Sequence, residues 1–452
     1  MSTHIQKDDI FSNPATISPP CLFPLIMKPK SRGNATLEIL ALGYGNGFVG
    51  RVIAAEDESL LGAKGFCDFT APGENVSGEL VEEKKNFFKL KATTINELSG
   101  DRQEPPCPYF GSCGGCSLQH LNYITQRKLK LETVRSLLKM HAHLEPPIEW
   151  YSEPLPEFGY RRRVIFHTDR EGKLGFYQPK SWKLQPIERC LIVTEGINNS
   201  LPALEACVAP YEGIFGDIVI EECDGKIFVE LRTRPKIKSI QVEDYRPLCH
   251  DLSEVADLVT IAHRGAVMML FSGGKQVNDV EYPVGHFSQV NDKGNLALQR
   301  LVLEGCQNAH EITELYAGAG NFSFPLAAAG KKVVAVEVDK ALVAYGMKQA
   351  VSHNLHENLT FVQKSTEKFV RKTPLLETVV LDPPRGGALE AVEQCKTDVT
   401  KNIVYVSCSA ATFARDSKVL AEKGYVLKHL MLVDMFPQGY HVELVGNFTF
   451  AG

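Results

Sequence analysis

A cysteine and an acidic residue in the C-terminal part of the chain could carry out covalent chemistry. Cys408 follows the apolar run 403–406, and in an open α/β sheet this position lies at the edge where ligands bind. A thiolate there can act as a nucleophile, with Glu443 as a candidate general base. Taken alone, Cys408 is better explained as a buried structural cysteine and Glu443 as a solvent-exposed strand acid.

A glycine turn upstream indicates a nucleoside-containing ligand. The apolar run 311–316 leads into Gly-Ala-Gly at 318–320, where glycines let the backbone approach a ligand. A dinucleotide-binding site would need a third glycine at position 323, which is Ser323. Glu337 ends the next strand, where an acid can bind ribose hydroxyls. The pattern fits S-adenosylmethionine, which has a ribose but no pyrophosphate; the alternative is a tight turn in another α/β protein.

A third motif places an acid beside a stiff loop. Asp382 follows an apolar strand and is followed by Pro383-Pro384-Arg385. Such a loop lies over the ligand crevice of an open sheet. Similar Asp-Pro-Pro turns occur in amino-group methyltransferases, so the motif does not fix the reaction. As structure only, it would be a turn with a capping aspartate.

Three cysteines crowd together at Cys107, Cys113 and Cys116. In a reducing compartment this crowding suggests metal binding or catalysis before disulfides. Three thiolates make most of a tetrahedral sulfur site, and a fourth ligand is needed. The candidates for the fourth ligand are Cys190, Cys207 and Cys223. Their spacing alone leaves zinc, an iron–sulfur cluster and free thiols open.

The elements that must position these residues follow an alternating pattern after about residue 290. We expect helices at 291–307, 321–329 and 340–354, and strands at 311–316, 332–338, 360–362, 378–381 and 403–406. This order is typical of a doubly wound, mostly parallel sheet.

The first half of the chain has a different pattern. After a tail at 1–30, expected to be mobile, short β-rich runs and glycine turns predict a small barrel at 31–100. The lysine-rich run 84–91 fits either an amphipathic edge strand or a basic, aromatic face for single-stranded nucleic acid. The arginines at 161–163 fit either a phosphate contact or a solvated strand start. An amphipathic helix is expected at 126–140.

Composition excludes some classes of protein. The 452 residues have an ordinary globular balance, and a net charge of -5 excludes a polycation, so any nucleic acid must be bound through local basic patches. No apolar run approaches the roughly 20 residues that span a bilayer. Without a secretory signal, we expect a cytoplasmic protein that does not bind membranes and is a monomer.

Taken together, six motifs resemble the bacterial RNA 5-methyluridine methyltransferases, and most of all the iron–sulfur branch that methylates large-subunit ribosomal RNA. They are Cys-Pro-Tyr-Phe-Gly-Ser-Cys-Gly-Gly-Cys-Ser-Leu-Gln-His at 107–120, Phe-Ser-Gln-Val-Asn at 287–291, the glycine turn at 318–320, Leu-Asp-Pro-Pro-Arg at 381–385, Val-Ser-Cys at 406–408 and Asp-Met-Phe-Pro-Gln at 434–438. The resemblance covers roughly residues 31–452.

The resemblance implies an α/β fold with three domains. These are an N-terminal TRAM domain, an OB-like RNA-binding β-barrel, at 31–100, a central α+β iron–sulfur and RNA-binding domain at 101–286, and a C-terminal Rossmann-like S-adenosylmethionine methyltransferase domain with a doubly wound sheet at 287–452. RNA is the implied partner, with ribosomal RNA preferred and the T-loop uridine of transfer RNA left open.

The resemblance also implies roles for individual residues. The implied ligands of a 4Fe–4S cluster are Cys107, Cys113, Cys116 and Cys190. The implied contacts of S-adenosylmethionine are Gln289, Tyr316, Glu337 and Asp382. Phe287 matches an aromatic that packs by the target base, Cys408 the nucleophile, and Glu443 the base that takes the C5 proton.

A thiol suits this chemistry because C5 of uracil is a poor nucleophile. Thiolate addition at C6 makes C5 enolate-like, and a base must then remove the C5 proton so that the thiolate can leave. The target base must also leave its stack. Two alternatives are an amino-group methyltransferase that uses the Asp382 loop and a degenerate methyltransferase that only binds RNA.

Five positions depart from the family pattern. Ser409 and Ala410 follow Cys408 in place of Asn-Pro. Gly439 stands where threonine is usual, Glu314 where aspartate is usual, and Gln349 where asparagine is expected. Because Cys408 and Glu443 are both present, we expect an active enzyme.

Overall fold

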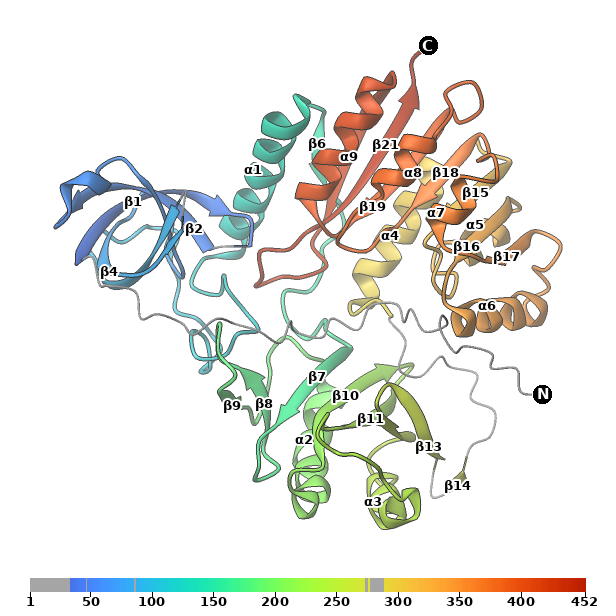
Figure 1. Ribbon diagram of the computed structural model, residues 1–452, viewed down its shortest axis with the longest axis horizontal. Helices are drawn as coiled ribbons and strands as arrows, with labels where there is room; N and C mark the ends of the chain where they lie inside the picture. Colours follow the sequence, from blue (N-terminus) through green and yellow to red (C-terminus); the bar gives the residue numbers. More distant parts are fainter. Residues whose placement is uncertain (1–32, 46, 85–86, 273–274, 277–287) are drawn as a thin grey trace, which may run out of the picture.

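The computed structural model describes residues 33–45, 47–84, 87–272, 275–276 and 288–452. Its strands form a closed barrel and two eight-stranded sheets (Figure 1). The expected mobile tail at 1–30 and Phe287 lie outside the described residues. No helix in the described part is long and apolar enough to cross a membrane.

The N-terminal strands close into a barrel in the order β1-β2-β3-β5-β4. The strands are β1 (Asn34–Gly43), β2 (Gly47–Ala55), β3 (Lys64–Cys67), β4 (Asn75–Lys84) and β5 (Phe87–Ile95), with a 3-10 turn η1 (Glu58–Leu60). Alternate residues of β1 are buried, as expected for a strand with one face on a core. Closure of the barrel removes the unpaired edges that an open sheet would expose.

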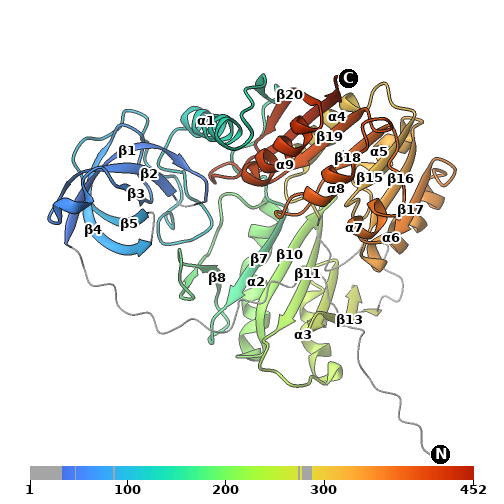
Figure 2. The ribbon, with the colours of Figure 1, turned by 45° about the horizontal axis from the view of Figure 1, so that its top comes forward.

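Helix α1 (Tyr123–Ala142) lies between the barrel and the C-terminal sheet in both views (Figures 1 and 2). It begins where Asn122 accepts a hydrogen bond from the Thr125 N–H and ends at His143 in the left-handed conformation. On one side, the Thr133 hydroxyl donates to the Leu42 carbonyl of β1. On the other side, buried residues of α1 pack in the core beneath α9. The helix expected at 126–140 is present and longer.

The central sheet has the order β14-β13-β12-β11-β10-β7-β8-β9. Its strands are β7 (Arg163–Thr168), β8 (Leu174–Tyr177), β9 (Leu184–Pro186), β10 (Phe215–Cys223), β11 (Lys226–Thr233), β12 (Leu258–His263), β13 (Ala266–Ser272) and β14 (Lys275–Gln276). The helices are α2 (Glu195–Val208) and α3 (Arg246–Leu252), with 3-10 turns η2 (Ala209–Tyr211) and η3 (Val242–Tyr245). Both helices pack on the sheet and on each other, so this sheet has a core of its own.

The C-terminal sheet has the order β17-β16-β15-β18-β19-β21-β20-β6. Its strands are β6 (Ile148–Trp150), β15 (Glu311–Leu315), β16 (Lys332–Glu337), β17 (Leu359–Gln363), β18 (Thr378–Leu381), β19 (Asn402–Ser407), β20 (Tyr425–Val433) and β21 (Glu443–Phe450). The five strands from β17 to β19 run parallel, and β21 is antiparallel to β19 and β20. The predicted doubly wound, mostly parallel sheet is confirmed. Residues 148–150, placed in the central domain from sequence, add a strand to this sheet instead.

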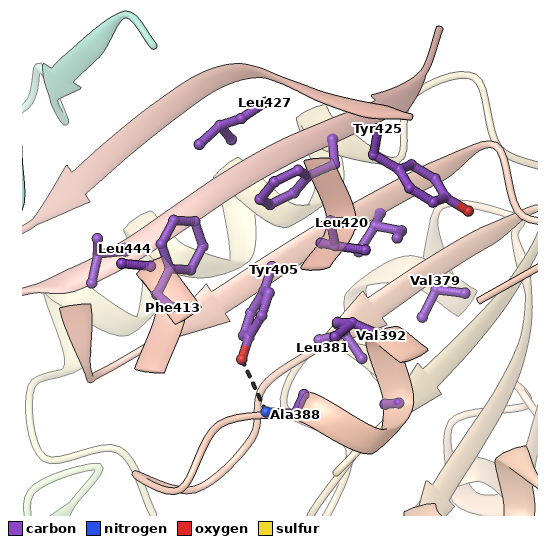
Figure 3. Packing of buried hydrophobic residues seen from close by; sticks show 14 of the residues in the cluster. Val379, Leu381, Ala388, Val392, Tyr405, Phe413, Leu420, Tyr425, Leu427 and Leu444 are labelled. Carbon is purple, nitrogen blue, oxygen red and sulfur yellow. Dashed lines mark hydrogen bonds between the residues drawn. The ribbon is translucent and has the colours of Figure 1, made fainter. Parts of the chain in front are cut away.

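Helices cover both faces of the C-terminal sheet. They are α4 (Asp292–Gly305), α5 (Ser323–Ala328), α6 (Lys340–Ser352), α7 (Thr366–Val370), α8 (Leu389–Gln394) and α9 (Ala410–Glu422). One core holds α4, α5 and α6, and another holds α1, α7, α8 and α9. In the second core, the buried Tyr405 hydroxyl accepts a hydrogen bond from the Ala388 N–H (Figure 3). The same hydroxyl donates a hydrogen bond to Asp416. These bonds anchor the far end of the loop that begins at Asp382.

Candidate active site

The predicted site residues follow strands that end at one edge of the C-terminal sheet. Tyr316 follows β15, Glu337 ends β16, Asp382 follows β18 and Cys408 follows β19. Because these strands are parallel neighbours, their carboxyl ends meet at the same edge. The sequence prediction that these four residues share an edge is therefore consistent with the topology.

The glycine turn at 318–320 is held by Glu337. Tyr316, Gly318 and Gly320 all have positive φ, at 63°, 58° and 101°. For a tyrosine this backbone conformation is strained, and such strain is found mostly at functional sites. The Glu337 carboxylate accepts a hydrogen bond from the Gly318 N–H at 2.9 Å and from the backbone N–H groups of residues 338 and 339. The acid expected to bind ribose thus stands at the turn itself.

A buried carboxyl lies behind this turn. Glu314 hydrogen-bonds the Ser323 hydroxyl at the start of α5. Burial, together with the nearby Asp382 and Glu337 carboxylates, raises the pKa of Glu314 to about 8, although the hydrogen bond from Ser323 acts in the opposite direction. The proton held by Glu314 therefore limits the negative charge under the turn. Sequence reasoning noted Glu314 only as a departure from the family pattern.

Cys408 and Glu443 emerge side by side from adjacent strands. Ser407, the last residue of β19, lies opposite Leu444 of β21, so Cys408, which follows Ser407, and Glu443, the first residue of β21, lie at the same edge of the sheet. Glu443 is only 5% exposed, which excludes the alternative of a solvent-exposed acid. Burial raises the pKa of Glu443 to about 8, with a further contribution from Asp382. A carboxyl that titrates near neutral pH is suited to proton transfer.

The Cys408 thiol is half-buried beside this carboxyl. Burial raises the pKa of Cys408 to about 11, and the charges of Glu443 and Asp382 raise it as well. The positive charge of Arg385 lowers the pKa of both Cys408 and Glu443, against the effect of burial. The thiol is therefore largely protonated in the free protein, and a positive charge brought close to it would favour the reactive thiolate.

Arg385 is held near the site by a histidine. A guanidinium nitrogen of Arg385 lies 3.3 Å from Nε2 of His441. Burial, together with the positive charges of Arg385 and Lys130, lowers the pKa of His441 to about 4. The ring is therefore neutral and can accept the hydrogen bond. Sequence reasoning did not single out Arg385 or His441; a signal was available in their positions, within the Asp-Pro-Pro-Arg motif and two residues before Glu443.

Comparisons with known proteins decide the family. The model of the family described as tRNA (Uracil-5-)-methyltransferase matches residues 273–448. A relative from Shewanella halifaxensis, named 23S rRNA (uracil(1939)-C(5))-methyltransferase RlmD, is 32% identical over 421 residues, with 88% of this chain and 93% of the relative covered. The protein of the same name from Shewanella amazonensis is 32% identical over 404 residues, with 85% of this chain and 90% of the relative covered.

The chain belongs to the RNA uracil-5-methyltransferase family.

The predictions of an S-adenosylmethionine-dependent methyltransferase and of an RNA uracil-C5 methyltransferase are thereby confirmed. A solved structure has the same fold: the Pyrococcus abyssi tRNA (uracil-54, C5)-methyltransferase in complex with S-adenosyl-L-homocysteine. Its TM-score is 0.67 at 22% identity, with 91% of this chain and 99% of that chain covered.

The Asp-Met-Phe-Pro-Gln motif of this methyltransferase is fixed to helix α1. Asp434 forms a buried ion pair with Lys130 at 2.7 Å, and Lys130 also donates to the Phe436 carbonyl. The side chains of Gln126 and Gln438 hydrogen-bond at 3.0 Å. Gln438 has a positive φ of 68°, which residues other than glycine rarely adopt. The hydrogen bonds to α1 therefore hold the backbone of this loop in an uncommon conformation. These contacts fix the loop that leads to Glu443 at the start of β21.

Gln289 lies in the segment that leads into α4. It is half-buried, and the neighbouring backbone pairs with the start of the central sheet through a hydrogen bond from the Arg162 N–H to the Val290 carbonyl. The arginine run is not a solvated strand start, because Arg162 and Arg163 are mostly buried and both contact Glu221. No described contact joins Gln289 to the other predicted cofactor residues.

The lysine-rich run 84–91 does not form a continuous basic face in the described residues. Lys89 is buried and forms an ion pair with Asp68 at 3.1 Å, and Phe88 lies in the barrel core. Lys84 pairs with Glu82 at the surface. If this run bound single-stranded nucleic acid, the buried and paired Lys89 would not contribute its charge.

Four cysteines of the enzyme line one cavity between the cysteine loop and the central sheet. The cavity has a volume of about 270 Å³, and the cysteines are Cys107, Cys113, Cys116 and Cys190. Of the three candidates for a fourth ligand, Cys190 is brought to this cavity, whereas Cys207 packs in the α2 core and Cys223 ends β10. Burial, with the other thiols, raises the pKa of Cys113 to about 11 and that of Cys116 to about 12.

Within the described residues, no three His, Cys, Asp or Glu side chains stand close enough to hold a single metal ion. The four thiols share a cavity without forming an ion-sized cage. Which metal group the four thiols could bind therefore depends on the size of that group.

Proposed function

We propose that this enzyme methylates C5 of a uridine in 23S ribosomal RNA through a covalent bond between Cys408 and C6. The observation that carries the proposal is the pairing of a half-buried thiol with a buried carboxyl at the ligand edge of the methyltransferase sheet. The RNA target is proposed from the curated relatives, which carry that name and align over most of the chain.

The reaction can be assigned to residues of this chain. The Cys408 thiolate adds to C6 of the uracil, and the electron pair displaced to C5 attacks the methyl group. Bound S-adenosylmethionine supplies that methyl group from a positively charged sulfonium. Glu443, as the carboxylate, then removes the C5 proton, the C6–S bond breaks and Cys408 is regenerated. Arg385 favours the charged forms of both residues.

We assign cofactor binding to Gln289, Tyr316, Glu337 and Asp382. Glu337 already accepts backbone hydrogen bonds at the glycine turn, so its carboxylate is oriented toward the place where a ribose would lie. Burial raises the pKa of Asp382 to about 7, which leaves a part of it protonated and able to donate.

We propose that Cys107, Cys113, Cys116 and Cys190 hold a 4Fe–4S cluster. The four thiols line a shared cavity of about 270 Å³, and sulfur-only ligation by four cysteines suits a 4Fe–4S cluster. The cluster would support the central domain, because the proposed reaction transfers no electrons.

We propose that the barrel at 31–100 is the TRAM domain and that it binds RNA together with the central domain. The barrel closes with five strands, as OB-like folds do, and its β1–β2 turn lies against the catalytic domain. The exposed ring of Trp182, between Lys180 and Lys183 on the β8–β9 hairpin, offers a base-stacking surface.

The test uses 5-fluorouridine, which cannot lose its C5 substituent as a proton. Wild-type enzyme is incubated with S-adenosylmethionine and with matched 23S rRNA and tRNA fragments that contain 5-fluorouridine, and adducts are measured by mass spectrometry. We expect an adduct on Cys408 with the 23S rRNA fragment that is absent in Cys408→Ala. An adduct only with the T-loop fragment would move the target to tRNA, which the fold of the Pyrococcus abyssi enzyme makes the second candidate.

Failure to form an adduct with any RNA would reject the covalent mechanism. Methyl transfer to an exocyclic amino group that survives Cys408→Ala would establish the amino-group alternative. RNA binding without any turnover would establish the degenerate RNA-binding protein.

A further inference from the structure

Glu443 stands at the end of a loop whose centre has an uncommon backbone conformation. Residues 434–442 connect β20 to β21, and Val433 and Glu443, at the two ends of this connection, lie opposite one another in the sheet. Gln438 lies in the middle of the loop, is 1% exposed and has a positive φ of 68°. This conformation costs free energy in a residue other than glycine, so it persists only where other contacts hold it.

Gln126 of α1 supplies such contacts from an element outside the loop. Its Oε1 accepts a hydrogen bond from the Gln438 backbone N–H at 3.2 Å, and its Nε2 donates to Oε1 of Gln438 at 3.0 Å. The same Nε2 donates to the Leu121 carbonyl at 2.9 Å. Both hydrogens of the amide nitrogen and the amide oxygen are therefore used, which gives the buried Gln126 side chain a single orientation.

The carbonyl of Gln438 is also held from outside the loop. The backbone N–H groups of Ser117 and Leu118 donate to it at 2.9 Å and 3.0 Å. The next residue does little to stiffen the chain, because Gly439 has no side chain. A Cβ at that position would meet the Phe436 carbonyl oxygen at 3.5 Å, an ordinary van der Waals distance. The conformation of the rest of the loop therefore depends on how firmly Gln438 is held.

We infer that Gln126 is a positioning residue for Glu443: its hydrogen bonds hold Gln438 at positive φ, and the loop fixed in this way places the general base. This inference rests on the proposed role of Glu443. Gln126 touches no reacting atom, so it is not a catalytic residue. Loss of its hydrogen bonds should slow removal of the C5 proton and leave the addition of Cys408 to C6 unaffected.

The experiment measures these two steps separately in Gln126→Met, which keeps a side chain of similar length without the amide. With ordinary uridine RNA at saturating concentration, we expect turnover to fall by about tenfold, as for the loss of roughly one hydrogen bond, and a methylated Cys408 adduct to accumulate. With 5-fluorouridine RNA, the adduct should form at the wild-type rate, because its formation requires no removal of a proton from C5. Mass spectrometry of quenched reactions measures both.

Two further variants test whether the effect belongs to this contact. Thr133→Val removes another side-chain hydrogen bond of α1, which is donated to the Leu42 carbonyl on the barrel side, and should leave turnover unchanged. Gln126→Glu keeps an acceptor for the Gln438 N–H and should retain more turnover than Gln126→Met. The ratio of methylated adduct to released product does not depend on how much protein is folded, so a loss of stability would not imitate the effect.

A double-mutant cycle tests whether Gln126 acts through the general base. In the Glu443→Gln background, Gln126→Met should cause no further loss of turnover. Unchanged turnover in Gln126→Met would overturn the inference, as would equal slowing with both RNAs or a further loss in the double variant. If Glu443→Gln itself accumulates no methylated adduct, the proposed role of Glu443 fails instead, so the two failures are distinguishable.

Discussion

The cavity lined by four cysteines and the site around Cys408 both contain half-buried thiols, but the neighbours of these thiols differ. In the cavity, the titratable groups that act on Cys113 and Cys116 are other thiols. Beside Cys408 stand two carboxyl groups and a guanidinium. Four equivalent sulfurs are suited to sharing a soft metal, whereas one sulfur among acids and a cation is suited to gaining and losing a proton. Burial alone thus does not define what a cysteine does; its charged neighbours do.

The largest expected contrast between the two regions comes from removing one thiol in each. Cys408→Ala should lower methyl transfer by about 10⁴-fold or more, because the covalent route is lost, while the iron content stays unchanged. Cys113→Ala should lower the iron content and leave some turnover in the protein that folds. Iron analysis and a methyl-transfer assay on both variants test this. Iron loss in Cys408→Ala, or full activity of that variant, would contradict the different roles proposed for the two kinds of cysteine.

The second prediction concerns Glu443, a carboxyl group that has no counterpart in the lining of the cysteine cavity. Glu443→Gln should lower turnover by about 10²–10⁴-fold, the usual contribution of a general base. Because only the last proton transfer is blocked, a methylated adduct on Cys408 should accumulate with ordinary uridine RNA. Mass spectrometry of the quenched reaction detects it. Slow turnover without any adduct would assign Glu443 to an earlier step.

The pH dependence of the methyl-transfer rate also tests the assignment of Glu443 as the general base. Burial raises the pKa of Glu443 to about 8, so the carboxylate needed as base becomes scarcer as pH falls below that value. Cys408, whose pKa is raised to about 11, must also lose its proton, so the single-turnover rate should rise steeply up to roughly pH 8 and by at most about tenfold per pH unit above it. Glu443→Gln should lose the break in slope near pH 8 and keep the rise that Cys408 sets. A wild-type rate that is flat from pH 6 to 9 would contradict the assignment.

The smallest effect on rate is expected at the cysteine cavity. Chemical reduction of the proposed cluster should leave methyl transfer unchanged, because no electron enters the proposed reaction. Cys116→Ser should lower the Tm by about 4–8 °C, as for a loss of roughly 2 kcal/mol, while turnover persists at temperatures below the transition. Strict dependence of turnover on the redox state would show that the two regions are coupled.

The sequence predicted those features that depend on local pattern. Alternating apolar runs gave the strands of the C-terminal sheet, and their shared carboxyl edge placed Cys408 and Asp382 together. The pairing of Cys408 with Glu443 required the register of β19 and β21, which periodicity does not encode. The same holds for Arg162 and Arg163, whose charges are met by Glu221 of another strand.

Strand β6 has a consequence for how this protein is made. Ile148 pairs with Leu430, and all the strands of the central sheet lie between these two residues in the sequence. A nascent chain emerges at about 5–20 residues per second, so β6 waits tens of seconds for its partner strand. Until then α1 and β6 expose surfaces that belong beneath α9 and beside β20. The central sheet and the barrel can fold during synthesis, whereas the catalytic sheet is completed only when the last strands leave the ribosome.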